Sequence, residues 1–169
     1  SGQFGDISPD GSTLVFPELY TPLTTTTTIS TETLYAPAFS FFSRLQAVNL
    51  ADNRATNLSS DAVVEDTAPL YAPDGQWLIF TRRGLTPDTW TPGRQLWRMR
   101  PDGREATSIT NDPIAYHSAV EWSPDGTRLV YMRTDSSDPS RAPEIWISNA
   151  DGTDAHAVVS GGFGPEWLP

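Results

Sequence analysis

A short turn motif that recurs three times places the strongest constraint on how this chain folds. Each copy is a small residue followed by Pro-Asp-Gly, and the copies are Ser8-Pro9-Asp10-Gly11, Ala72-Pro73-Asp74-Gly75 and Ser123-Pro124-Asp125-Gly126. Proline presets φ at the first corner of a tight turn, aspartate caps its own backbone, and glycine adopts the positive φ that the reversal needs. A short strand-like run follows every copy. The repeat therefore predicts similar units built from hairpins.

A second turn recurs out of phase with the first. Its copies are Ala51-Asp52-Asn53, Pro101-Asp102-Gly103 and Ala150-Asp151-Gly152, and short apolar or alternating runs flank each of them. Every repeat then contains four short strands, one before and one after each of its two turns. Four antiparallel strands in about 45 to 50 residues is the size of a β-propeller blade. Because no segment shows a sustained helical period, we predict an all-β protein.

Two of the repeats resemble the WD-type repeat of TolB-like β-propellers. The resemblance is carried by residues 122–131 (Trp-Ser-Pro-Asp-Gly-Thr-Arg-Leu-Val-Tyr), by residues 144–152 and by residues 95–103. The first repeat departs from this pattern, since Ile7 replaces the expected aromatic residue and Asn53 replaces the expected glycine. The resemblance implies a propeller fold and an extracytoplasmic setting, in the periplasm, at the cell surface or secreted.

The repeat divides the chain into three blades within a single propeller segment covering residues 1–169. We predict blade one at about 4–59 with a long hairpin insertion at 17–43, blade two at about 67–110, blade three at about 118–160, and one extra inner strand at 163–168. Closed rings contain roughly four to eight blades. We therefore expect half of a roughly six-bladed ring, completed by another segment or another chain. The alternative is two half-rings that pair around a twofold axis.

Alternation of the strands places both short turns of each blade on one rim. The opposite rim then carries the long connections, at 17–43, 82–94 and 132–143 within the blades. Binding residues concentrate on long loops held by a rigid scaffold, so we predict the binding surface on this long-loop rim. Its candidate residues are Trp90 and, in the aromatic insertion, Tyr35 and Phe39. An exposed aromatic ribbon would dock a protein partner; alternatively, these aromatics pack against a neighbouring blade and continue the core.

Acidic residues recur on the predicted inner strands. Asp6, Glu121 and Glu166 each lie three residues before the equivalent proline. They would form part of an anionic collar that attracts cations or a basic peptide, or else accept loop amides and pair with an interblade arginine. Asp66 and His117 share an earlier position near the channel mouth and complete the set of candidate binding residues.

Composition excludes several classes of function. Twenty-one acidic residues against eleven basic ones give a formal net charge of −10, the wrong sign for a surface that holds nucleic-acid phosphates. Every basic residue is an arginine and cysteine is absent, which excludes lysine Schiff bases and thiolate sites. No apolar run approaches the ~18 residues of a membrane span. We predict neither nucleic acid nor a membrane span among its partners.

Residues for catalysis were also sought. The chain has two histidines, lacks the known phosphate, dinucleotide and nucleophile motifs, and supplies no catalytic residue, metal site or cofactor site by these criteria. We therefore predict a non-catalytic binding or scaffolding propeller that recognises a protein or peptide. One alternative is an assembly or filament subunit that pairs its orphan strand with another chain. The resemblance implies a further one, the propeller part of a peptidase or a sugar lyase.

Overall fold

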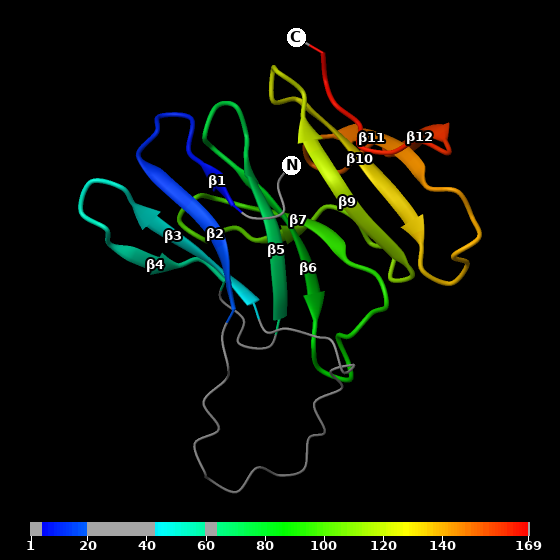
Figure 1. The fold of residues 1–169 in the computed structure, drawn as a ribbon, viewed down its shortest axis with the longest axis horizontal. Coiled ribbons are helices and arrows are strands. Elements are labelled where there is room, and N and C mark those ends of the chain that lie inside the picture. Colours follow the sequence, from blue (N-terminus) through cyan, green and yellow to red (C-terminus); the bar gives the residue numbers. More distant parts are fainter. Residues whose placement is uncertain (1–4, 20–42, 60–63, 169) are drawn as a thin grey trace, which may run out of the picture.

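The computed structural model describes residues 5–19, 43–59 and 64–168. Within those ranges the chain forms twelve β-strands and no helix (Figure 1), which confirms the all-β prediction. The aromatic insertion lies largely in the remainder, so Tyr35 and Phe39 are outside the described residues.

The strands fall into three consecutive units in which each strand pairs antiparallel with the next along the chain. Unit one contains β1 (Asp6–Ile7), β2 (Thr13–Leu19), β3 (Ser43–Asn49) and β4 (Ala55–Asn57). Unit two contains β5 (Val64–Tyr71), β6 (Leu78–Gly84), β7 (Gln95–Met99) and β8 (Thr107–Ser108). Unit three contains β9 (Ala115–Trp122), β10 (Arg128–Asp135), β11 (Glu144–Asn149) and β12 (His156–Ser160). β5 and β9 begin three residues before the predicted starts of blades two and three.

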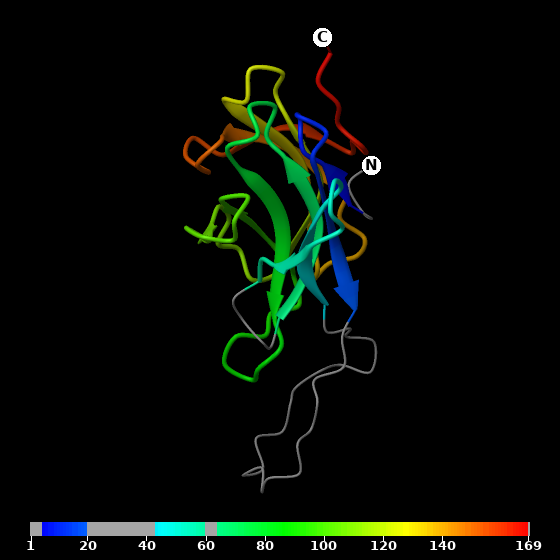
Figure 2. The ribbon, with the colours of Figure 1, turned by 90° about the vertical axis from the view of Figure 1, so that its left-hand side faces the viewer.

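Both short turns of a unit lie on the same rim, as predicted. The Leu50 amide donates to the Ser12 carbonyl at 2.8 Å, and the Ala150 amide donates to the Thr127 carbonyl at 2.9 Å, so the two turns touch within units one and three. Figures 1 and 2 show the Pro-Asp-Gly turns along the upper edge, with the connection 85–94 at the lower edge. Hydrogen bonds inside the turns explain their aspartates. The Asp125 carboxylate accepts from the Ser123 hydroxyl at 2.6 Å and from the Thr127 amide at 3.0 Å.

The hydrophobic core lies between the units. Units one and two join in one eight-stranded sheet through a parallel bridge between Ser43 of β3 and Glu65 of β5, and unit three forms a four-stranded sheet. One cluster joins units one and two and comprises Val15, Leu45, Ala47, Leu58, Tyr71, Leu78, Phe80 and Met99. A second cluster joins units two and three and comprises Ala72, Ile79, Leu96, Val120, Trp122, Leu129 and Tyr131. β2, β3, β5, β6 and β7 supply most of the first cluster, and β6, β7, β9 and β10 supply most of the second. Burial of these side chains therefore holds the units together.

The predicted inner strand at 163–168 is not observed: residues 161–168 form no strand. A strand needs a neighbouring backbone edge, and this segment is interrupted by Gly164 at φ +53° and by Pro165, which has no amide to donate. The segment instead runs back along unit three (Figure 1), and the guanidinium of Arg128 lies 5.2 Å from the ring centre of Trp167.

Candidate binding site

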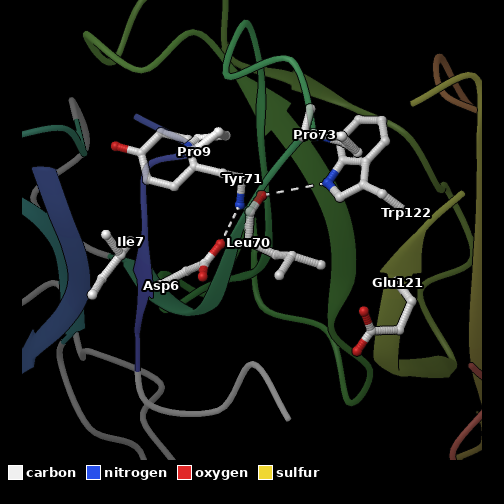
Figure 3. A pocket seen from close by; sticks show the side chains of 9 residues that line it. Asp6, Ile7, Pro9, Leu70, Tyr71, Pro73, Glu121 and Trp122 are labelled. Atoms are coloured by element: carbon white, nitrogen blue, oxygen red, sulfur yellow. Dashed lines mark hydrogen bonds between the residues drawn. The ribbon is translucent and has the colours of Figure 1, made fainter. Parts of the chain in front are cut away.

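A pocket of about 270 Å³ opens where β1, β5 and β9 end beside the Pro-Asp-Gly turns (Figure 3). It combines two carboxyl groups with aromatic and proline side chains. Its lining residues are Asp6, Ile7, Pro9, Leu70, Tyr71, Ala72, Pro73, Glu121 and Trp122. The repeat explains this set, because residues at equivalent positions of successive units converge on one place.

Asp6 fixes the boundary between units one and two. Its Oδ2 accepts a hydrogen bond from the Tyr71 amide at 2.7 Å, as Figure 3 shows. The sequence led us to expect a loop amide as the donor, whereas the amide that Asp6 accepts belongs to β5 of the next unit. The bond orients the carboxylate at the pocket wall and gives a hydrogen-bond acceptor to the partly buried Tyr71 amide at the end of β5.

Trp122 performs a similar function at the next boundary. Its indole Nε1 donates to the Leu70 carbonyl at 3.5 Å, and the side chain is 8 % exposed. Tyr71, at the equivalent position of unit two, is 7 % exposed, whereas Ile7 in unit one is 52 % exposed. The aromatic wall of the pocket is therefore part of the packing between units and is held rigidly.

Charges of both signs act on the carboxyl group of Glu121 in the pocket. Partial burial raises the pKa of Glu121, a nearby positive charge acts in the opposite direction, and the negative charges of Glu166 and Asp6 raise the pKa further. Burial and the charges of Asp6 and Asp10 likewise raise the pKa of the Tyr71 hydroxyl. Glu166 is exposed, on the segment that follows β12. Of the three acids predicted as a collar, Asp6 and Glu166 each lie within electrostatic reach of Glu121, at the end opposite the long-loop rim.

Asp66, predicted near the channel mouth, is buried. Its two carboxylate oxygens accept from Nε and Nη2 of Arg82, each at 2.7 Å, and Oδ2 also accepts from the Ser59 hydroxyl at 2.6 Å. Arg82 packs against the rings of Phe80 and Trp97. Asp66 therefore joins β5 to β6 and to the end of unit one, and all of these contacts lie inside the fold.

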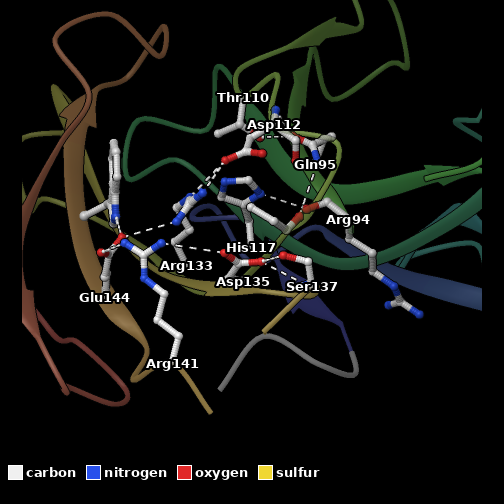
Figure 4. Close-up of polar contacts among 12 residues, drawn as sticks. Arg94, Gln95, Thr110, Asp112, His117, Arg133, Asp135, Ser137, Arg141 and Glu144 are labelled. Carbon is white, nitrogen blue, oxygen red and sulfur yellow. Dashed lines mark hydrogen bonds and ion pairs between the residues drawn. The ribbon is translucent and has the colours of Figure 1, made fainter. Parts of the chain in front are cut away.

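His117 occupies the position of Asp66 in unit three and is also buried. Its Nδ1 lies 2.9 Å from the Arg94 carbonyl (Figure 4), and burial lowers its pKa. Arg133, opposite His117 in the sheet, pairs with Asp112 at 2.5 Å and with Glu144 at 3.3 Å. Where histidine replaces aspartate, the arginine takes carboxylate partners from neighbouring segments.

Sequence reasoning missed Glu65 and Arg94 on the long-loop rim. The Arg94 guanidinium pairs with Glu65, donates from Nη1 to the Thr67 hydroxyl at 2.8 Å, and lies 5.6 Å from the ring centre of Tyr116. An acidic pair at 65–66 was the available signal for Glu65. Trp90 lies half-buried in the same connection, where its amide donates to the Thr86 carbonyl at 2.8 Å. Its role in binding stays a prediction.

Residues 5–19, 43–59 and 64–168 contain no group of three or more histidine and acidic side chains placed to hold a metal ion. The same ranges contain no helix that is long and apolar enough to cross a membrane.

Comparison with known proteins identifies the fold. No protein-family profile matches the chain, and no curated protein matches it. Solved structures do match: a TolB candidate from Agrobacterium tumefaciens superposes with a TM-score of 0.64 at 19 % identity, covering 92 % of this chain and 48 % of that one. An oligogalacturonate lyase from Vibrio parahaemolyticus gives 0.62 at 20 % identity, with 92 % and 40 % covered. An oligogalacturonate lyase in complex with manganese gives 0.61 at 18 % identity, with 95 % and 43 % covered.

The chain therefore has a β-propeller fold of the TolB-like kind. It spans about half or less of the length of these solved structures. At such identities the likeness describes the arrangement of strands, and function has to be argued from the site.

Proposed function

We propose that this chain is a non-catalytic propeller segment that binds a cationic group of a protein or peptide in the pocket between β1, β5 and β9. The observation that supports the proposal is that the carboxyl groups of Asp6 and Glu121 line one pocket together with Tyr71 and Trp122, while Glu166 lies within electrostatic reach of Glu121. Clefts lined by one sign of charge concentrate ligands of the opposite sign. The proposed contact thus moves from the long-loop rim to the end that carries the Pro-Asp-Gly turns.

The size of the pocket supports a side-chain-sized ligand. A volume of about 270 Å³ lies below the range of roughly 300 to 1,000 Å³ for drug-sized ligands. A guanidinium or ammonium group would sit beside the carboxylates of Asp6 and Glu121, with the largely buried Tyr71 and Trp122 forming the wall behind it. A lone arginine or lysine of an extended peptide fits this description.

Calorimetric titration with a blocked arginine-containing tripeptide tests the proposal. The matched probe contains citrulline in place of arginine and has nearly the same shape without the charge. We expect the arginine peptide to bind more tightly, and Glu121→Gln to weaken its binding by about threefold to tenfold, since one partly exposed charge contributes about 1 kcal/mol. The control variant is Glu105→Gln, on a distant exposed turn. Equal binding of the two peptides, or an unchanged affinity in Glu121→Gln, would exclude the pocket as a cation site.

The likeness to oligogalacturonate lyases favours a second candidate, the propeller part of a sugar lyase. Incubation with oligogalacturonate and manganese, followed by absorbance of the unsaturated products that lyases form, separates the two proposals. Product formation that a chelator abolishes would support the lyase and contradict a non-catalytic role.

We also propose that the intact propeller contains about six such units, of which this chain supplies three. The coverage of 48 % and 40 % of two solved propeller chains supports this number. The TolB-like fold further supports an extracytoplasmic location, which cell fractionation with an antibody against the chain would test.

A further inference from the structure

A single carbonyl group joins the connection 85–94 of unit two to β9 of unit three. The backbone amide of His117 donates to the Arg94 carbonyl at 3.1 Å, and Nδ1 of the His117 ring lies 2.9 Å from the same oxygen (Figure 4). A carbonyl oxygen only accepts hydrogen bonds, so Nδ1 carries a proton and Nε2 is the basic nitrogen of the neutral ring. We call these two interactions the His117 contact.

The ring of His117 lies inside the boundary between units two and three. The residue is 2 % exposed, and its ring centre lies 5.7 Å from that of Tyr131 on β10. The end of the connection is packed closely as well. The Gly93 amide donates to the Pro113 carbonyl at 3.1 Å, and a Cβ on Gly93 would overlap the backbone of Ala115. All of these groups belong to units two and three, so the contact does not depend on what lies beyond either outer unit.

Charged groups on neighbouring segments determine how the ring responds to a proton. Arg133 on β10 is the Cα partner of His117, and its guanidinium disfavours a charged ring. Asp112, in the connection before β9, favours a charged ring, but Nε and Nη2 of Arg133 already donate to its Oδ2 at 3.0 and 2.5 Å. Glu144 on β11 also pairs with Arg133, at 3.3 Å, and the hydrogen bond from the Trp146 indole lowers its pKa. A charged ring would therefore compete with Arg133 for carboxylates that are already paired.

Unit two has the opposite arrangement at the equivalent position. Asp66 accepts from Nε and Nη2 of Arg82, each at 2.7 Å, so a negative group faces the arginine of β6. In unit three a basic ring faces the arginine of β10. A proton on His117 therefore places two positive charges inside one boundary, whereas Asp66 and Arg82 form a matched pair at the other.

We propose that the His117 contact is an acid-sensitive closure of the long-loop rim between units two and three. When Nε2 takes a proton from water, the charged ring leaves the boundary and the end of the connection 85–94 separates from β9. The Arg94 side chain stays on unit two, because its guanidinium pairs with Glu65 on β5. Tyr116 of β9, whose ring centre lies 5.6 Å from that guanidinium, then loses its neighbour. This inference goes beyond the proposed ligand, whose pocket lies at the opposite end, and does not depend on it.

The direction of the effect follows from the buried position of the ring. Burial lowers the pKa of His117 below its ordinary value of 6.5, and the charge of Arg133 acts in the same direction, against the Arg94 hydrogen bond and the charge of Asp112. The separated form, with an ordinary pKa, then binds the proton more tightly than the closed form does. The contact is therefore most stable above pH ~6.5 and weakens as the pH falls below that value.

Amide hydrogen exchange, measured by NMR at pH ~7.5 and ~5.5, tests the proposal in the 169-residue chain. The probes are the Gly93 and His117 amides, and the reference is the Leu58 amide, which donates to the Leu45 carbonyl at 2.8 Å within unit one. If only the separated form takes the proton, at the ordinary pKa of 6.5, its population rises by up to about tenfold over this range. We expect the protection factors of the two probes to fall by about threefold to tenfold and that of Leu58 to stay constant.

A pair of histidine variants assigns the effect to one ring. His117→Asn keeps a side-chain N–H donor in place of Nδ1 and removes the basic nitrogen, so the protection factor of Gly93 should become the same at both pH values. The control is His156→Asn. The His156 ring makes a similar contact, with the Asp154 carbonyl at 2.8 Å, but it is exposed, and this variant should keep the pH dependence of the parent chain.

A ring-proton titration of His117 in the parent chain keeps the test decisive if His117→Asn does not fold. Its midpoint should lie below 6.5. A midpoint at or above 6.5, or a Gly93 protection factor that does not change with pH, would overturn the proposal. A fall at Leu58 as large as that at Gly93 would overturn it too, since the proton would then act on the whole fold rather than on the His117 contact.

Discussion

The buried ion pair between Asp66 and Arg82 should dominate the stability of the boundary between units one and two. Asp66→Ala removes a carboxylate that accepts three hydrogen bonds from two side chains. The Arg82 guanidinium then stays between Phe80 and Trp97, 5.2 and 4.9 Å from their ring centres, with its main counter-charge gone. Breaking such a buried pair costs about 3 to 5 kcal/mol, a large part of the roughly 5 to 15 kcal/mol that stabilise a domain.

Urea unfolding at one fixed protein concentration measures this effect. With a slope of about 1 to 3 kcal/mol per molar urea, the midpoint of Asp66→Ala should fall by roughly 2 M. The double variant Asp66→Leu with Arg82→Met removes both charges together and should recover much of the loss. Arg104→Gln, which breaks the exposed contact with Asp102, should leave the midpoint unchanged. A midpoint of Asp66→Ala equal to that of the parent, or a double variant as unstable as the single one, would refute this reasoning.

Three further results follow from local contacts. The hydrogen bond from the Ser123 hydroxyl is the main reason why the pKa of Asp125 is lowered from 3.8 to about 2. The contribution of Asp125 to the free energy of unfolding is therefore complete above pH ~4 and is lost as the pH falls toward 2. The difference in urea midpoint between the parent chain and Asp125→Ala should disappear over that range. Ser118→Ala should raise stability by about 1 kcal/mol, because the Ser118 hydroxyl is buried with no hydrogen-bond partner among the described residues. In thermal unfolding, Gly152→Ala should destabilise the chain by about 1 to 3 kcal/mol more than Gly161→Ala. Both glycines have a similar positive φ, but a Cβ on Gly152 would lie 2.5 Å from the Ile109 carbonyl oxygen, whereas a Cβ on Gly161 would meet no atom within 4 Å.

Turn chemistry made most of the fold predictable. Pro-Asp-Gly and Asp-Gly turns encode their geometry in adjacent residues, so the four-strand units and the shared rim of the short turns could be predicted without tertiary information. The bulges in β5 and β9 could not. Ala68 and Ala119 have φ of +53° and +49°, values that alanine rarely adopts and that nothing in the local sequence announces. Both strands also begin before the predicted boundaries, at Val64 and Ala115.

The site was only partly predictable because partner choice is a tertiary property. Counting from the turns placed Asp6 and Glu121 at equivalent positions, and both line one pocket, whereas Glu166 is not among the residues that line it. The same counting grouped Asp66 with His117 as channel-mouth residues, although both side chains are buried with intramolecular contacts. Their partners, Arg82 and the Arg94 carbonyl, lie on other strands or loops, and no spacing along the chain reveals them.

The contact between Arg94 and His117 couples two parts of the rim that usually vary independently. The connection 85–94 belongs to unit two. The carbonyl of its last residue, Arg94, contacts both the backbone amide and the ring Nδ1 of His117 in unit three, and the Arg94 guanidinium pairs with Glu65. Insertions there would disturb the neighbouring unit as well. New recognition properties are therefore more easily acquired through the connection 136–143, most of which is exposed, than through its counterpart in unit two.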